Sequence, residues 1–547
     1  MFKKIFHSRT KTVTFAALLV GLSALISRLL GLWRDRLLAG TFGAGEDLDV
    51  YFAAFRIPDF VFGIIITGGI SAIFLPVLSE YFKKSEPEGW KLASNVLNCF
   101  LAALVFLCGL LAIFTPWLIN LIAPGFNVEQ KALAIVLTRI MFLSPVFLGI
   151  SAIFSGVLQY FDKFFAYSLA PVLYNLGIIF GILVLAPIFG LNGLVYGVIL
   201  GAFLHLLVQV PAAQAVGFKF LPLFNFKAAG LAKIFKLMVP RIVGTAAYHI
   251  NLIVVTAIAS TLTVGSIAIF NFSNNLQYFP IGIVGTSFAL AAFPTLSRAW
   301  VNGQKKDFLD NFSSVFRQII FLIVPVSILI FLLRAQLTRL ILGTGNFGWE
   351  ETRLTAACLG FFCLGIFATS LVPLLARAFY SFQNTKTPVA IGLVSMTLNV
   401  ILSFVLVANL QDAGAFKGLV SNALKLQGIE NIAVLGLPLA LSVSAVFQFS
   451  LLVYFLRRRL GHIRLKEILR SSLKILAVSI LMAVAAYLIL QALAGFFSLT
   501  TFWGILWQTA LTCFFGVFIY LLVAYLWRFP EARTIKHSIF KQFSHVK

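Results

Sequence analysis

Residues 13–39 read VTFAALLVGLSALISRLLGLWRDRLLA, an apolar run whose charged side chains all fall in its second half. About 20 apolar residues are enough for a helix to cross the hydrocarbon core of a bilayer, so the run predicts a membrane-spanning helix. Charges such as Arg28 and Arg34 cost about 2.5–3.5 kcal/mol each at the centre of such a helix on insertion scales. Residues of this kind usually line a polar cavity, which makes the run the first candidate for a binding site.

Apolar runs recur along the whole chain of 547 residues, which is 60% hydrophobic and only 11% charged. A soluble protein would carry roughly 25% charged residues. The chain is therefore predicted to be an all-α polytopic membrane protein, because a membrane β-barrel would show short segments of alternating hydrophobicity. Fourteen segments are expected, at about 13–39, 49–80, 91–117, 132–160, 164–187, 193–216, 233–260, 265–297, 308–341, 352–382, 388–407, 433–456, 471–496 and 502–527.

The formal net charge of +24 would suggest a nucleic-acid partner in a soluble protein. Most of the Lys and Arg residues lie instead at the N-terminus, in every second loop and in the C-terminal tail. This is the positive-inside pattern of cytoplasmic loops, and it predicts that both termini are cytoplasmic and that no nucleic acid is bound. The five cysteines lie inside apolar segments without metal-ligand spacing, so they are interpreted as core residues and no metal site is expected.

Matching residues in the two halves of the chain predict an internal duplication. Pro76 in segment two corresponds to Pro294 in segment eight, and Asn175 in segment five corresponds to Asn399 in segment eleven. Six helices separate the copies, so both would insert in the same orientation as lobes related by a pseudo-two-fold axis. The predicted domains are an N-lobe of six helices at 1–217, a linker at 218–232, a C-lobe of six helices at 233–458, and a basic linker, two further helices and a tail at 459–547.

The linker 218–232 mixes phenylalanines with lysines. Basic amphipathic segments lie along membrane surfaces and attract anionic lipids. We therefore expect this linker to lie on the cytoplasmic face and to contact anionic membrane lipids.

A set of motifs keeps its order and spacing over the first segments and is joined by two more in segment eight. They are SRLLGLWRD at 27–35, FGAG at 42–45, Asp49, FxxFRIP at 52–58, FxPVLSEY at 74–81, FPxGxxG at 279–285 and FPxLS at 293–297. Together they resemble the MurJ (MviN) family of lipid II flippases, within the multidrug/oligosaccharidyl-lipid/polysaccharide transporter superfamily. The resemblance covers essentially the whole chain. It implies two six-helix lobes around a central cavity, with two extra helices that shape a groove for an isoprenoid tail.

The resemblance also implies a function. The substrate would be lipid II, an undecaprenyl-pyrophosphate-linked peptidoglycan precursor, which an alternating-access flippase moves across the bacterial inner membrane without enzymatic chemistry. The chain lacks the Gly-x-x-x-x-Gly-Lys-Ser/Thr phosphate loop, so we expect no cofactor and a membrane potential or ion gradient as the energy source. We expect the protein to act as a monomer. The alternatives are an exporter of another lipid-linked oligosaccharide or of a cationic drug, a membrane glycosyltransferase and a non-transporting scaffold.

Seven polar residues within or beside apolar segments are candidates for contact with the lipid-linked head group: Arg28, Arg34, Asp49, Arg56, Arg241, Asn274 and Asn275. A guanidinium binds phosphate oxygens bidentately, which favours Arg28 as the pyrophosphate ligand, with Arg241 as its counterpart in the second lobe. Arg34 lies about 120° around the helix from Arg28, and the alternative is that it only pairs with Asp35. For Asp49 the alternative is a structural role at a helix N-terminus.

The chain departs from the family pattern at three places. Where the family commonly has arginine after the proline of segment two, this chain reads Asp59-Phe-Val-Phe-Gly63, and Thr67 replaces a common glutamate. Asn274-Asn275 replaces a common Asp-Arg pair, so Arg28 and Arg241 would carry more of the anion binding. His249 is a candidate for a proton-sensitive switch, and a hydrogen bond to a neighbouring helix is the alternative.

Overall fold

The computed structural model describes residues 13–461, 463–498 and 500–533. Within these ranges the chain forms helices joined mostly by short turns, and no β-strand occurs in them. The predicted all-α class is confirmed. The basic N-terminus at 1–12 and the tail from residue 534 onward, both predicted to be cytoplasmic, lie outside the described residues.

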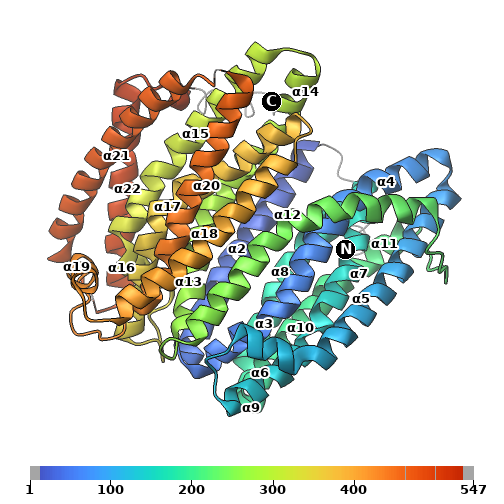
Figure 1. The fold of residues 1–547 in the computed structure, drawn as a ribbon, viewed down its shortest axis with the longest axis horizontal. Coiled ribbons are helices and arrows are strands. Elements are labelled where there is room, and N and C mark those ends of the chain that lie inside the picture. Colours follow the sequence, from blue (N-terminus) through green and yellow to red (C-terminus); the bar gives the residue numbers. More distant parts are fainter. Residues whose placement is uncertain (1–12, 462, 499, 534–547) are drawn as a thin grey trace. The chain divides into compact units, whose positions relative to one another are not determined.

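The chain divides into two compact units, of which the first comprises Met1–Ala268 with Thr344–Gly348. Figure 1 shows its helices in blue to green. In chain order they are α2 (Val13–Phe42), α3 (Glu46–Val61), the π-helix η1 (Phe62–Ile70), α4 (Ser71–Lys84), α5 (Glu86–Ile122), α6 (Val128–Met141), α7 (Leu143–Tyr160), α8 (Phe164–Phe180), the π-helix η2 (Gly181–Leu185), α9 (Ala186–Phe189), α10 (Leu191–Leu207), α11 (Val210–Ala215) and α12 (Ala229–Ser260).

The second unit comprises Ile269–Gly343 and Trp349–Lys547. Its helices, green to red in Figure 1, are α13 (Ser266–Pro280), which starts in the first unit, the π-helix η3 (Ile281–Thr286), α14 (Ser287–Val301), α15 (Lys305–Leu332), α16 (Arg334–Ile341), α17 (Trp349–Ser381), α18 (Lys386–Gln411), α19 (Ala415–Ala423), the short 3-10 helix η4 (Ala433–Leu435), α20 (Gly436–Leu460), α21 (Leu465–Ala494) and α22 (Phe502–Leu526).

Eleven of the described helices are long and apolar enough to cross a membrane, or twelve if the bent helix α12 counts as one span. Predicted segments one and two form α2 and the continuous stretch α3–η1–α4, which are not among the eleven. The predicted count of fourteen is therefore not confirmed. Helix α12 bends by 53° between Ala229–Val239 and Gly244–Ser260, and the break contains Pro240, which has no amide to complete the helical hydrogen bonds.

Each unit has its own apolar core. In the first, residues such as Ile70 and Phe74 are fully buried among α3, α4, α5 and α7. Leu231, Ile234 and Met238 of α12 belong to the same core. Helix α12 therefore packs in the first unit, although its sequence belongs to the second predicted repeat.

The predicted linker contains no helix between residues 218 and 228, because side chains of α5 hold its backbone in an irregular path. Asn95 donates to the carbonyl of Asn225 at 2.9 Å and accepts from its amide at 2.7 Å. Asn98 donates to the carbonyls of Leu221 at 2.7 Å and Leu223 at 3.0 Å. With the backbone fixed in this way, three phenylalanines of the linker are left exposed: Phe220, Phe224 and Phe226.

Candidate functional site

The charged stretch of α2 faces α8, which packs along it in the first unit (Figure 1). Arg34 forms an ion pair with the buried Asp35 at 2.8 Å, and its Nη1 donates to Asn175 Oδ1 of α8 at 3.3 Å. Asn175 Nδ2 in turn donates to Ser27 Oγ at 3.1 Å. The guanidinium charge of Arg34 is thus balanced inside the first unit. This matches the alternative drawn from the sequence, in which Arg34 pairs with Asp35. Substrate contact by Arg34 stays a prediction.

Helical spacing explains this arrangement. Ser27, Gly31 and Arg34 lie four and three residues apart and so share one face of α2. A Cβ on Gly31 would lie 4.0 Å from Asn175 Oδ1, so this face approaches α8 closely. Helix α2 runs without interruption through Gly31. The half-buried Arg28 therefore lies about 120° around the axis from Arg34, on a different face of the helix.

Asp49 is buried in the first turn of α3, and its carboxylate caps the start of α13. Oδ2 accepts from the amide of Gly265 at 2.7 Å and Oδ1 accepts from that of Ala268 at 2.8 Å. Gly265 has φ +88°, and a Cβ there would lie 2.0 Å from the carbonyl oxygen of Ala44. A carboxylate at a helix N-terminus accepts hydrogen bonds from free backbone amides and interacts favourably with the positive end of the helix dipole. The geometry supports the structural role of Asp49, and head-group contact by it stays a prediction.

Polar side chains also connect α3 to α12. Arg56 Nε donates to Oγ1 of the buried Thr256 at 2.7 Å. One turn later, Asp59 Oδ2 lies 3.7 Å from His249 Nδ1. Sequence reasoning missed Asp59 and Thr256 as functional candidates. The sequence did contain a sign of Asp59: it lies three residues after Arg56. That spacing places two charges on one face of an apolar segment.

The remaining candidates lie farther along the chain. Arg241 is in α12, and its side chain lies outside what the structure describes. Asn274 is buried in α13 of the second unit, where its Oδ1 accepts from Gln277 Nε2 at 2.9 Å. Asn275 is half-buried in the same helix. Contact of Asn274 and Asn275 with a head group stays a prediction.

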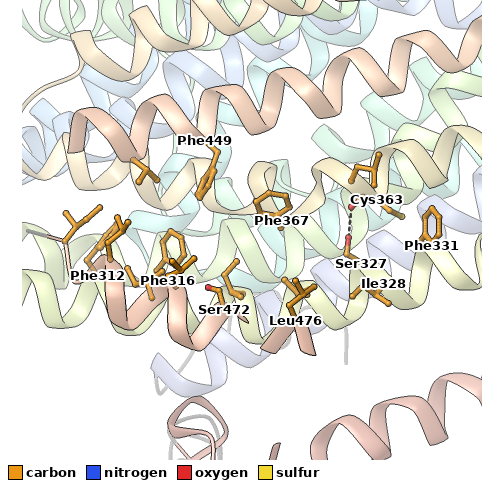
Figure 2. Close-up of a pocket in the computed structure, with 18 residues that line it drawn as sticks. Phe312, Phe316, Ser327, Ile328, Phe331, Cys363, Phe367, Phe449, Ser472 and Leu476 are labelled. Carbon is orange, nitrogen blue, oxygen red and sulfur yellow. Dashed lines mark hydrogen bonds between the residues drawn. The ribbon is translucent and has the colours of Figure 1, made fainter. Parts of the chain in front are cut away.

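An apolar cavity of about 620 Å³ lies in the second unit, among α15, α17, α20 and α21 (Figure 2). Aromatic side chains form much of its wall: Phe312, Phe316, Phe331, Phe367 and Phe449. The hydroxyl of Ser327 faces the carbonyl of Cys363, to which it donates at 2.9 Å, and so offers little polarity to a ligand. Leu364 and Leu469 are exposed at its edge. This cavity suits a flexible hydrocarbon chain, since it has almost no group to bind a polar one.

Helix α21 reaches the cavity because buried polar contacts attach the two C-terminal helices to α15. Glu531, just after α22, is buried and lies 3.4 Å from Arg317 of α15. Its Oε1 also accepts from Ser471 Oγ of α21 at 2.8 Å. Tyr520 of α22 donates to the carbonyl of Phe321 at 2.8 Å. In Figure 1 α21 and α22 accordingly lie beside one another against α15.

Among the residues that the structure describes, no group of three or more His, Cys, Asp or Glu side chains is arranged to hold a metal ion. All five cysteines are free, and four of them are buried. Cys99 and Cys108 belong to the apolar core of the first unit, and Cys363 belongs to that of the second.

Comparison with known proteins places these features in a family context. A family model described as lipid II flippase MurJ matches residues 38–508. A probable lipid II flippase MurJ of Buchnera aphidicola subsp. Acyrthosiphon pisum is 31% identical over 400 residues, which cover 72% of this chain and 78% of that protein. The lipid II flippase MurJ of Burkholderia cenocepacia is 29% identical over 408 residues, covering 73% and 79%.

Solved structures give the same result for the fold. Lipid II flippase MurJ in an inward closed conformation superposes with a TM-score of 0.74 at 25% identity, over 93% of this chain and 99% of that one. An inward-facing multidrug resistance transporter of the MATE family matches with a TM-score of 0.62 at 15% identity, over 82% and 99%. The second likeness concerns the fold alone.

Proposed function

This chain belongs to the MurJ family of lipid II flippases, and from that premise we propose that it translocates lipid II across the bacterial inner membrane. The resemblance stated from the residue motifs is thereby confirmed, and the glycosyltransferase alternative is set aside because the family consists of transporters. The observation on this chain that supports the proposal is the apolar cavity of about 620 Å³, which α21 helps to line. A substrate with a long polyprenyl tail needs such a surface, whereas a small water-soluble substrate does not.

We propose that Arg28 binds the pyrophosphate. It is half-buried on a face of α2 that differs from the face of Arg34, whose guanidinium is already paired with Asp35. Guanidinium groups form bidentate, charge-assisted hydrogen bonds with phosphate oxygens. Arg241 would be the counterpart from the second repeat. The head group then crosses while the tail stays in an apolar environment, and no covalent bond is made or broken.

We further propose a membrane potential or ion gradient as the energy source, a monomer as the working unit and both termini on the cytoplasmic side. The orientation rests on the distribution of Lys and Arg among the loops. The linker 218–232 would then contact anionic lipids. Its backbone is held by Asn95 and Asn98, so that its exposed phenylalanines and the neighbouring lysines are presented outward.

Complementation tests the function. A strain depleted of its lipid II flippase should grow with the wild-type chain and fail with Arg28→Ala, at equal protein levels in the membrane. Arg298→Ala, which removes an exposed arginine at the end of α14, should grow normally. Failure of a well-expressed wild type would redirect the assignment to another lipid-linked oligosaccharide. Growth with Arg28→Ala would remove Arg28 from the proposed binding site.

A further inference from the structure

Two titratable side chains meet where α3 packs against α12. Asp59 Oδ2 is 3.7 Å from His249 Nδ1, and the side chains are 35% and 14% exposed. Two turns farther along α12, Thr256 accepts a hydrogen bond from Arg56. The α3–α12 contact, defined by these four residues, therefore runs antiparallel and contains two polar pairs.

The absence of a side chain at Gly63 makes room for the imidazole of His249. A Cβ on Gly63 would lie 1.9 Å from His249 Nε2 and 2.2 Å from Cε1, so the imidazole rests directly on the helix backbone. The rings of Phe60 and Tyr248 meet it edge-on, with centroids 6.4 Å and 5.3 Å away. Any side chain at position 63 would displace the imidazole from Asp59.

The net charge of the α3–α12 contact depends on the protonation states of Asp59 and His249. With neutral His249, the carboxylate of Asp59 and the guanidinium of Arg56 sum to zero, and one added proton raises the sum to +1. Tyr248 on α12 and Tyr174 on α8 are the phenols that interact with these groups, and phenols are neutral near pH 7. The sequence of η1, which packs against α12, contains no titratable residue. Histidine normally titrates between about pH 5 and 8, so a proton is the ion that this pair is suited to bind.

We propose that Asp59 and His249 form a proton-binding site that couples a proton gradient to transport. The imidazole takes one proton from water on one side of the membrane and returns it to water on the other, so only an N–H bond forms and breaks. In the protonated state the imidazolium and the carboxylate hold α12 to α3 as an ion pair. Loss of the proton removes that attraction and loosens the contact. This inference rests on the proposed function and names its coupling ion.

The coupling is tested with purified protein in proteoliposomes that contain lipid II. A gradient of one pH unit, imposed at zero membrane potential, should raise the initial rate of lipid II translocation by the wild type several-fold. His249→Gln and Gly63→Ala should lose this acceleration while their dissociation constant for lipid II changes less than about twofold. His205→Gln is the matched control, because His205 bonds Ser151 elsewhere in the first unit and should keep the acceleration.

A second measurement separates the proton site from the transport function. In ¹⁵N-histidine-labelled protein, the titration midpoint of His249 should shift in Asp59→Asn, and that of His205 should not. The proposal is overturned if the His249 midpoint does not shift in Asp59→Asn, or if a pH gradient still accelerates lipid II translocation fully in His249→Gln. Acceleration of translocation by a sodium gradient alone would also overturn it. A wild type that moves no lipid II but shows the shifted midpoint would refute the proposed function and leave the proton site standing.

Discussion

The carboxylate of Asp49 accepts a hydrogen bond from the amide of Gly265 at 2.7 Å, across 216 residues of chain. A second bond, from the amide of Ala268, makes this one side chain the cap of α13. The first turn of α3 and the turn that precedes α13 are therefore held together by charge-assisted bonds at the edge of the first unit.

Removing this cap should destabilise the protein. Each buried hydrogen bond to a charged group contributes about 1.5–3 kcal/mol, so Asp49→Ala, which removes two of them, should lower the free energy of unfolding by roughly 3–6 kcal/mol. Thermal unfolding in detergent measures the effect. Asp47→Ala, an exposed acid in the same helical turn, is the control and should unfold at the wild-type temperature. Equal unfolding temperatures for both variants would contradict the capping role.

The ion pair of α2 predicts that the stability losses caused by substituting Arg34 and Asp35 are not additive. Asp35→Ala leaves the guanidinium of Arg34 largely buried without its carboxylate, and breaking a buried pair costs about 3–5 kcal/mol. The hydrogen bond from Arg34 to Asn175 should reduce this cost only in part. The double variant Arg34→Ala/Asp35→Ala removes both charges and should be more stable than Asp35→Ala alone. Thermal unfolding of the three variants measures the coupling, and additive losses would show that the pair contributes nothing.

The apolar cavity predicts a defect that depends on the length of the lipid tail. Ser472→Trp places a large ring in the cavity and should slow translocation of lipid II with its natural tail about tenfold or more. Analogues with a short prenyl tail should be moved at nearly the wild-type rate, because they do not need the full cavity. Ser450→Trp puts the same ring on an exposed position of α20 and serves as the control. Equal slowing of both substrates would argue against tail binding there.

The linker should be released when its side-chain supports are removed. Asn98→Ala deletes the hydrogen bonds to the carbonyls of Leu221 and Leu223, and so frees the backbone beside Lys219 and Lys227. Trypsin should then cleave this segment several-fold faster than in the wild type, as followed by gel electrophoresis. Asn409→Ala changes an exposed asparagine of α18 and should leave the cleavage rate unchanged. An unchanged rate in Asn98→Ala would mean that other contacts hold the linker.

Much of the helix pattern was predictable from the sequence, because the length of an apolar run is a local property. Segment five at 164–187, for example, coincides with the stretch from α8 to α9, and segment thirteen at 471–496 overlaps α21 over all but its last two residues. The count of fourteen is not confirmed, because the first two predicted segments, α2 and α3–η1–α4, are not among the helices that qualify as membrane spans within the described residues. The family was recognisable for a similar reason, since its motifs keep their spacing along the chain.

The partners of the polar side chains were decided only by the tertiary structure. The pairing of Arg34 with Asp35 was foreseeable because the two are adjacent, but Asn175 reaches Arg34 from 141 residues away. Asp59 drew no functional interpretation until folding placed His249 beside it and Gly63 beneath the ring. Sequence alone thus determined that this chain is a helical membrane protein with charges in its lipid-spanning segments. Which charge meets which partner depends on how distant helices pack, because a polar group in an apolar interior is stable only where another helix supplies its counterpart.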